Sequence, residues 1–167
     1  KPTVELNEAV FLKRSVLFAA GLPLPSAAAQ IAALFGERVR ERPGREGQPP
    51  YYEILGTDGR TAGYVFIRTG PGLWGEITAA VGFDGNLEKL TGVDFLRQNE
   101  TPGLGARIGE AWFREQFRGK KGPLTVVGEG QPDGESEFDA ITGATFTTNF
   151  VKDLLNDAVA QVRQLMN

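Results

Sequence analysis

The spacing of apolar residues near the C-terminus constrains the fold more than any other feature of the chain. Apolar side chains recur there at steps of one, three and four positions. They are Phe146, Phe150, Val151, Leu154, Leu155, Ala158, Val159, Val162 and Leu165. This spacing predicts an amphipathic α-helix of about five turns. Such a helix is stable when its apolar face packs against another element of the fold.

Strand-forming segments in the middle of the chain are joined in pairs by short turns. They are Tyr51–Leu55 with Ala62–Arg68, and Leu73–Phe83 with Leu87–Phe95. The first pair flanks residues 56–59 and the second flanks residues 84–86, and both connections contain an Asp-Gly pair that favours tight hairpin turns. A short helix near Glu110–Phe117 and a short strand at Leu124–Val127 are expected next. The middle of the chain therefore predicts an antiparallel or mixed sheet.

Two further helices are predicted before the strands. The first covers Asn7–Ala20, and Gly21 with Pro23 ends it. The second opens at Pro25-Ser26. Its apolar face holds Ile31, Leu34, Phe35 and Val39. Three segments are expected to be loops, namely Arg40–Pro50, Arg97–Arg107 and Gly128–Glu137.

Helices at both ends of a hairpin-rich middle predict an α+β fold. We expect one domain, because 167 residues suit a single domain with a substantial core. Its antiparallel or mixed sheet would be flanked by the N-terminal helices and by the long C-terminal helix. Within this domain we expect residues 1–50 to form a helical lead-in that packs against a core formed by residues 51–167.

The composition excludes several classes of function. The chain has no Cys and no His, which excludes disulfides, thiolate metal sites, cysteine nucleophiles and imidazole chemistry. Any redox chemistry therefore has to come from a bound cofactor. The net charge of −3, from 18 basic and 21 acidic residues, argues against a nucleic-acid-binding protein. No apolar run approaches the roughly 18 residues that indicate a membrane span.

A run of small and hydroxyl-bearing residues, Thr142-Gly143-Ala144-Thr145, stands at the entry to the last helix, with Asp139 shortly before it. Such residues commonly cap the free backbone N–H groups of a helix. The same N–H groups and the positive end of the helix dipole also favour a phosphate. A threonine hydroxyl at this place could be esterified by that phosphate.

Two other segments have both a structural and a ligand-binding interpretation. In residues 99–106, Pro102-Gly103 suits the centre of a type II turn, and the glycines permit close approach to a planar ligand. In residues 70–75, Trp74 lies between glycines at a strand edge. An aromatic side chain in that position packs in the core or faces a cleft.

In this order and spacing, the three segments resemble the FMN-binding domain. That domain occurs in the C subunit of the sodium-translocating NADH:quinone oxidoreductase and in the G subunit of the Rnf complex. The resemblance implies that a flavin transferase cleaves FAD and joins FMN through its phosphate to the last threonine of the motif, which is Thr145 here. It also implies that Asp139 takes part in recognition by the transferase. The remaining residues expected at the cofactor are Thr142, Gly143, Ala144, Leu73, Trp74, Glu100, Thr101, Gly103, Leu104 and Lys121. Either Lys121 or its neighbour Lys120 would approach the phosphate or a ring carbonyl.

The resemblance also implies partners and a location. The domain would relay electrons between neighbouring redox centres of a membrane-bound, ion-translocating complex and would have no independent catalytic activity. A single N-terminal membrane helix holds the domain on the extracytoplasmic side in this family, and since the chain starts at Lys1 we expect that anchor to have been removed ahead of it. Leu73-Trp74 and the N-terminal helix ending Ala19-Ala20-Gly21-Leu22, which resembles the segment after the membrane anchor, favour the quinone-reductase type, although both types of complex stay open.

Two other classes of function stay open from the residues alone. A non-redox binding domain of related fold is compatible with the turn, cap and core interpretations of the three motifs. A hydrolase would use carboxylates such as Glu76, Asp84 or Glu100. Flavin attachment separates the first of these alternatives from the electron-transfer interpretation.

Overall fold

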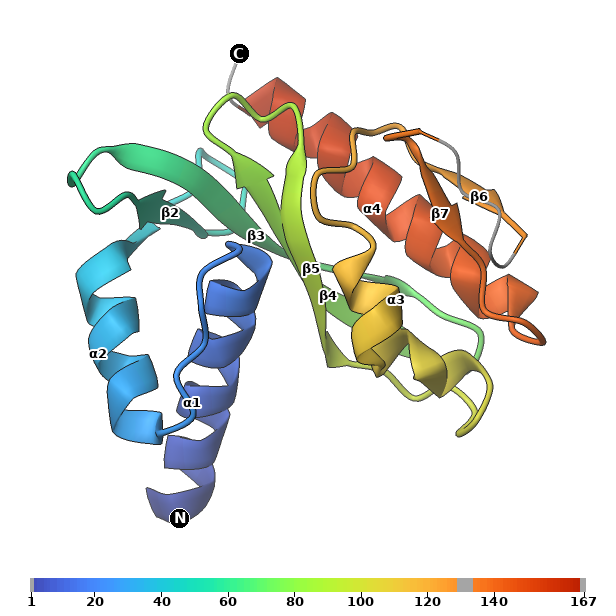
Figure 1. Cartoon of the computed structure of the whole chain (residues 1–167), viewed down its shortest axis with the longest axis horizontal. Coiled ribbons are helices and arrows are strands. Elements are labelled where there is room, and N and C mark those ends of the chain that lie inside the picture. The colour runs from blue at the N-terminus through green and yellow to red at the C-terminus, as the bar shows by residue number, and fades with distance from the viewer. Residues whose placement is uncertain (1, 129–133, 166–167) are drawn as a thin grey trace.

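A five-stranded antiparallel sheet with helices on both faces forms the centre of the α+β fold (Figure 1). The computed structural model describes residues 2–128 and 134–165. The helices are α1 (Pro2–Ala19), α2 (Ala28–Arg38), η1 (Gly105–Gly109), α3 (Ala111–Glu115) and α4 (Thr145–Leu165). The strands are β1 (Val39–Arg42), β2 (Tyr51–Leu55), β3 (Thr61–Pro71), β4 (Glu76–Asp84), β5 (Leu90–Arg97), β6 (Thr125–Val127) and β7 (Glu137–Asp139).

The strands of the main sheet follow one another in the order β1-β2-β3-β4-β5, so each neighbouring pair is antiparallel and consecutive in the chain. Short connections of this kind suit hairpins. β6 and β7 form a separate parallel pair beside α4. The predicted antiparallel sheet between terminal helices is confirmed.

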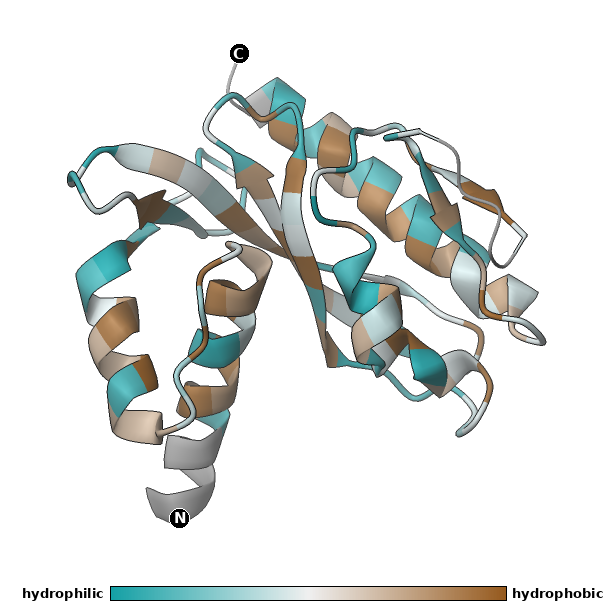
Figure 2. Ribbon diagram, in the orientation of Figure 1, coloured by the Kyte–Doolittle hydropathy of each residue, from teal (hydrophilic) through white to brown (hydrophobic). Residues whose placement is uncertain are grey.

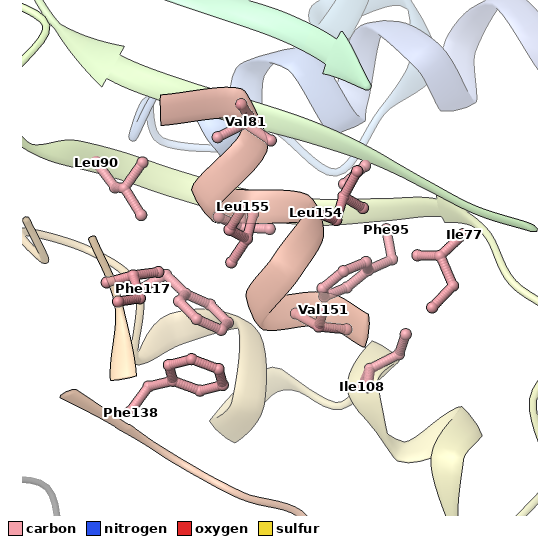
Figure 3. Packing of buried hydrophobic residues seen from close by; sticks show 14 of the residues in the cluster. Ile77, Val81, Leu90, Phe95, Ile108, Phe117, Phe138, Val151, Leu154 and Leu155 are labelled. Atoms are coloured by element: carbon pink, nitrogen blue, oxygen red, sulfur yellow. The ribbon is translucent and has the colours of Figure 1, made fainter. Parts of the chain in front are cut away.

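The alternation of side chains along the strands divides the core into two layers. Val65 and Ala80 point to the face covered by α1 and α2, whereas Phe66 and Val81 point to the face covered by α4. On the α4 face, Val151 and Leu155 are fully buried, and Figure 3 shows them among side chains of β4, β5, η1 and β7. Apolar and polar segments alternate along the ribbon of α4, as expected for a helix with one buried face (Figure 2).

The predicted apolar face of α4 is confirmed except at its beginning. Phe146 is 69% exposed and does not join the core. It lies in the first turn of the helix, and its side chain lines a surface pocket instead. The side chain of Leu165 lies outside the described residues.

The stop signal after the first helix is also confirmed. Gly21 has a φ of +78°, and its N–H donates to the carbonyl of Phe18 while the N–H of Leu22 donates to the carbonyl of Leu17. This pair of bonds is the Schellman motif that glycine favours at helix ends. No helix among residues 2–128 and 134–165 is both long and apolar enough to cross a membrane.

Several boundaries differ from the sequence prediction because non-local pairing decides them. Residues 39–42 form β1, although Val39 was expected on a helix face and residues 40–50 in a loop. Val39 is buried opposite Ile54, and Arg42 forms a 2.7 Å ion pair with Glu53. These partners lie in another strand, so local composition does not reveal them.

Other boundaries shift near turns. β3 continues to Pro71, and β4 begins only at Glu76. Leu87 has a φ of 59° in the turn before β5, and β5 starts only at Leu90. The expected loop at 97–107 ends in η1, and the expected loop at 128–137 ends in β7. Residues 129–133 of that second loop lie outside the described residues.

Candidate functional site

The three motifs singled out in the sequence converge on one small surface pocket of about 80 Å³ at the start of α4. The pocket is lined by Leu73, Trp74, Thr101, Leu104, Gly105, Gly143, Ala144, Thr145, Phe146 and Thr147. The turn between β3 and β4, the segment before η1 and the entry to α4 each contribute part of this lining. Hydrogen bonds within the fold hold the three segments in place.

The entry to α4 is fixed by its own backbone and by Thr148. The Thr148 hydroxyl donates to the carbonyl of Ala144 at 2.8 Å and accepts the N–H of Ile141 at 3.2 Å. Gly143 has a φ of +81°, and a Cβ at this position would lie 3.2 Å from Leu104 Cδ2. Thr145 is the first residue of the helix and is exposed. The first backbone N–H groups of a helix have no carbonyl one turn earlier to donate to.

The turn that contains Pro102 has the geometry predicted for it. The N–H of Leu104 donates to the carbonyl of Thr101 at 3.1 Å, and Gly103 has a φ of +78°. This is the positive φ that the third position of a type II turn requires. The turn places Leu104 over Gly143 and Thr101 at the rim of the pocket.

Glu100 lies beneath the pocket and is only 4% exposed. Its Oε1 accepts the N–H of Leu73 at 2.9 Å, and its Oε2 accepts the N–H of Trp74 at 3.0 Å. Oε1 also accepts the hydroxyl of Thr147 at 2.7 Å. A buried carboxylate needs such donors, because an unpaired polar group away from water is unfavourable.

The rim of the pocket is unusually apolar for an exposed surface. Leu73 and Leu104 are 45% and 44% exposed, and Trp74 and Phe146 are each 69% exposed. Large apolar side chains that gather in one exposed place commonly mark a binding site. The combination of an exposed hydroxyl, a helix N-terminus and an apolar rim suits a ligand with a phosphate at one end and a planar, partly apolar group at the other.

Comparison with known sequences decides the family. The sequence pattern of the FMN-binding domain matches residues 72–160, which include every segment of the pocket. The chain belongs to the FMN-binding domain family. The predicted resemblance is therefore confirmed.

Relatives from two kinds of complex share this sequence. The G subunit of the Na(+)-translocating ferredoxin:NAD(+) oxidoreductase complex of Acetobacterium woodii is 35% identical over 113 residues, which cover 65% of this chain and 53% of the relative. The C subunit of the Na(+)-translocating NADH-quinone reductase of Chlamydia pneumoniae is 30% identical over 172 aligned positions, covering 79% and 53%. The chain thus spans about half the length of these curated relatives.

Solved structures show the same fold. The C subunit of the Na(+)-translocating NADH-quinone reductase from Parabacteroides distasonis superposes with a TM-score of 0.80 at 23% identity, over 99% of this chain and 96% of that one. NqrC of Shewanella oneidensis gives a TM-score of 0.80 at 19% identity, over 90% and 91% of the two chains. The α+β arrangement is shared with both.

The residues at the pocket fit the chemistry of FMN in this FMN-binding domain. Thr145 offers a hydroxyl and the start of α4 offers N–H groups for a phosphate, while Leu73, Trp74 and Leu104 offer apolar contacts for a flavin ring. A pocket of about 80 Å³ is too small to enclose a whole FMN, so much of a flavin anchored here would remain outside it.

The structure does not bring Lys121 to this pocket. Its N–H donates to the carbonyl of Glu135, and the next residue, Gly122, packs against Val159. Val159 follows Thr145 by fourteen residues in the same helix, which corresponds to about 21 Å along the axis. Lys121 therefore lies far along α4 from Thr145, whose attached phosphate or flavin ring it was expected to approach.

Asp139 lies at the end of β7, shortly before the pocket segment. Its N–H donates to Gln116 Oε1 at 2.8 Å, and its carbonyl accepts Gln116 Nε2 at 3.2 Å. Thr142 is exposed in the turn between Asp139 and α4. The pocket also includes two residues that the sequence interpretation missed: Phe146 was assigned to the core, and Thr147 was given no role at the cofactor.

Larger cavities lie elsewhere. One of about 640 Å³ is on the other face of the sheet, between α1 and the ends of β3, β4 and β5, and one of about 440 Å³ lies between β3 and α4. Neither contains a residue that the sequence predicts at the cofactor. We assign the site to the smaller pocket because three sequence-distant motifs meet there.

Two features of the structure argue against the hydrolase hypothesis. Glu76 and Asp84 stand at opposite ends of β4, and both oxygens of Glu100 accept hydrogen bonds from the fold. Among residues 2–128 and 134–165 there is also no group of three or more acidic side chains that could hold a metal ion. The geometry favours the flavin interpretation.

Proposed function

We propose that this chain is the flavin-carrying, electron-transfer part of a membrane-bound, ion-translocating complex, with FMN joined through its phosphate to Thr145. The observation that carries the proposal is the position of the exposed Thr145 hydroxyl at the N-terminus of α4, beside the apolar rim formed by Leu73, Trp74 and Leu104. Membership of the FMN-binding domain family supports it.

The attachment is a balanced group transfer. Thr145 Oγ1 forms the new bond to the phosphorus of the FMN half of FAD while the phosphoanhydride bond of FAD breaks. AMP leaves and the hydroxyl proton is released. A flavin transferase would catalyse this step, and we propose that Asp139, just before the modified turn, contributes to its recognition of the chain.

The residues of the chain would hold the attached group in two ways. The first N–H groups of α4 and the helix dipole favour the phosphodiester anion. The small residues Gly143 and Ala144 leave the backbone accessible, and Leu73, Trp74 and Phe146 offer apolar surface. The flavin, when bound, supplies one- and two-electron transfer, and the protein sets its position and surroundings.

The proposed partners follow from the names of the relatives. Those relatives are subunits of Na(+)-translocating or ion-translocating oxidoreductase complexes. We propose that this domain passes electrons between neighbouring redox centres of such a complex. We also propose that it lies on the extracytoplasmic side of the membrane, held there by an N-terminal membrane helix. Relatives from both types of complex match this chain, so the proposal includes both.

Co-expression of the chain with a flavin transferase tests the attachment. Intact mass should rise by FMN less one water for the wild type and for Thr145→Ser, and should not rise for Thr145→Val. Thr57→Val is the control, since it removes an exposed hydroxyl in the turn between β2 and β3, outside the pocket, and should still be modified. Flavin attached to Thr145→Val, or a colourless wild type beside a transferase that modifies a known substrate, would contradict the proposal. The second result would favour a non-redox binding domain.

A further inference from the structure

The carboxylate of Glu100 joins two segments that line the pocket, although the side chain does not line it. One segment is the turn that carries Leu73 and Trp74, whose N–H groups donate to the two oxygens separately. The other is the first turn of α4, where the Thr147 hydroxyl donates to Oε1. Three donors from two segments therefore end on one buried side chain.

The turn between β3 and β4 depends on this carboxylate for the position of Trp74. Within the turn, the N–H of Gly72 donates to the carbonyl of Gly75 at 2.7 Å and closes the loop. The backbone N–H groups of the two residues at its tip, Leu73 and Trp74, donate to Glu100 instead. Trp74 is 69% exposed, so burial contributes little to holding it. The hydrogen bond from the Trp74 N–H to Glu100 Oε2 fixes the backbone from which the indole side chain extends.

The connection to α4 places the same carboxylate next to the residue that we propose carries the flavin. Thr147 follows Thr145 by two positions and is 2% exposed. Gly105 permits this close approach, because a Cβ there would lie 2.6 Å from Thr147 Oγ1 and 2.8 Å from Glu100 Cβ. Glu100 thus packs against Gly105 and Thr147, which themselves line the pocket.

We propose that Glu100 is a positioning residue for the flavin, which holds the Leu73–Trp74 turn at a fixed place relative to Thr145 and so fixes the apolar surface beside the attached group. This inference rests on the proposed function. It differs from direct flavin contact, because both carboxylate oxygens are engaged by the fold and the pocket lining does not include this residue. Replacing an acceptor oxygen of Glu100 with a donor group should therefore change the surroundings of the flavin ring, even when the flavin is attached to Thr145.

Two substitutions separate the hydrogen bonds. Glu100→Gln keeps the size of the side chain but places an amide NH₂ where one oxygen accepts, so a backbone N–H of Leu73 or Trp74 must face another donor. Thr147→Val removes the hydroxyl and leaves both backbone N–H groups paired. Thr147→Ser keeps the hydroxyl and is the matched control.

The experiment uses the full chain in two forms. In flavin-free protein, amide hydrogen exchange by NMR should be faster by about tenfold or more at Leu73 or Trp74 in Glu100→Gln, and should stay within about threefold of wild type at both in Thr147→Ser. In flavin-loaded protein, the visible circular dichroism and the midpoint potential should change in Glu100→Gln and in Thr147→Val, and Thr147→Ser should match the wild type.

Flavin-loaded Glu100→Gln and Thr147→Val with wild-type spectra and potentials would overturn the positioning role. If Glu100→Gln does not fold, Thr147→Val against Thr147→Ser decides the question, because neither removes the carboxylate. A wild type that takes up no flavin at Thr145 would instead overturn the proposed function, and the mass measurement distinguishes the two failures.

Discussion

The Thr147 hydroxyl donates a 2.7 Å hydrogen bond to Glu100 Oε1, and the two residues lie 47 positions apart in the sequence. Both are almost fully buried. A hydrogen bond to a carboxylate in such a place contributes about 1.5–3 kcal/mol to stability. The bond therefore joins the first turn of α4 to the segment before η1, and it does so directly under the pocket that contains Thr145.

Replacing Thr147 with Val should lower the free energy of unfolding by about 1–3 kcal/mol. The shape of the side chain is kept, but Glu100 loses one of its three donors. Urea denaturation measures the change. Thr147→Ser should lose only about 1 kcal/mol, because it lacks one buried methyl group and keeps the hydroxyl. Equal stability of Thr147→Val and wild type would show that the bond contributes nothing.

Replacing Gly105 with Ala should be more harmful than the same change at Gly109. A Cβ at Gly105 would lie 2.6 Å from Thr147 Oγ1, whereas nothing lies within 4 Å of a Cβ at Gly109. Overpacking of this kind lowers stability by about 1–3 kcal/mol. Alanine in the open position should be neutral or slightly stabilising, since it restricts the unfolded chain. Thermal unfolding of the two variants side by side checks the difference, and similar melting temperatures would contradict the packing described.

The sequence predicts those parts of the fold that depend on local chemistry. The apolar stripe of α4, the stop at Gly21 and the turn at Pro102-Gly103 are examples, and the structure confirms each. β1 and β7 were missed because their partners lie in other strands, and a short polar strand carries no periodic signal of its own.

The candidate site likewise has features that local sequence predicts and features that depend on residues far apart in the chain. Leu73, Trp74, Thr101 and Leu104 line the pocket and were singled out through family motifs, whereas Phe146 and Thr147 were not. The role of Glu100 was not found either, because its three donors lie 26, 27 and 47 positions away. Lys121 illustrates the opposite error: a basic residue suits a phosphate chemically, but the path of the chain decides whether it reaches one. Its neighbour Gly122 packs beside Val159, far from the start of α4.

Arg118 should prove important for holding the first helix on the domain. Its Nη1 donates to the carbonyls of Phe18 and Thr91 at 2.9 and 2.8 Å, and its guanidinium lies 4.3 Å from the Phe18 ring centre. Arg118→Ala should lower the free energy of unfolding by about 2–3 kcal/mol, because two carbonyls lose a charged donor. Arg60→Ala, at an exposed turn, is the control and should change it by less than about 0.5 kcal/mol. Denaturant titration of both variants provides the comparison.

The link between β1, β2 and β3 should weaken in acid through Glu53. Hydrogen bonds from the Thr61 hydroxyl and from Arg42 hold the pKa of the Glu53 carboxyl below its ordinary value of 4.5. A lowered folded-state pKa stabilises the fold above the unfolded-state value, and this contribution is lost as the pH falls through the folded-state pKa. Glu53→Gln should thus be less stable than wild type near pH 7 by up to about 1 kcal/mol, and this difference should shrink below pH 4.5. A stability difference between Glu53→Gln and wild type that stays constant down to pH 3 would contradict the lowered pKa of Glu53.

Trp74 should affect the flavin much more than the fold. Because its side chain is 69% exposed, Trp74→Ala should change the free energy of unfolding by less than about 0.5 kcal/mol. The same substitution removes the largest apolar surface beside Thr145, so the midpoint potential and visible circular dichroism of the attached flavin should shift. Trp112→Phe is the matched control, since Trp112 is also partly exposed but does not line the pocket. Potentiometric titration of the two loaded variants decides the matter: an unchanged potential in Trp74→Ala, or an equal shift in both, would place the flavin ring away from this turn.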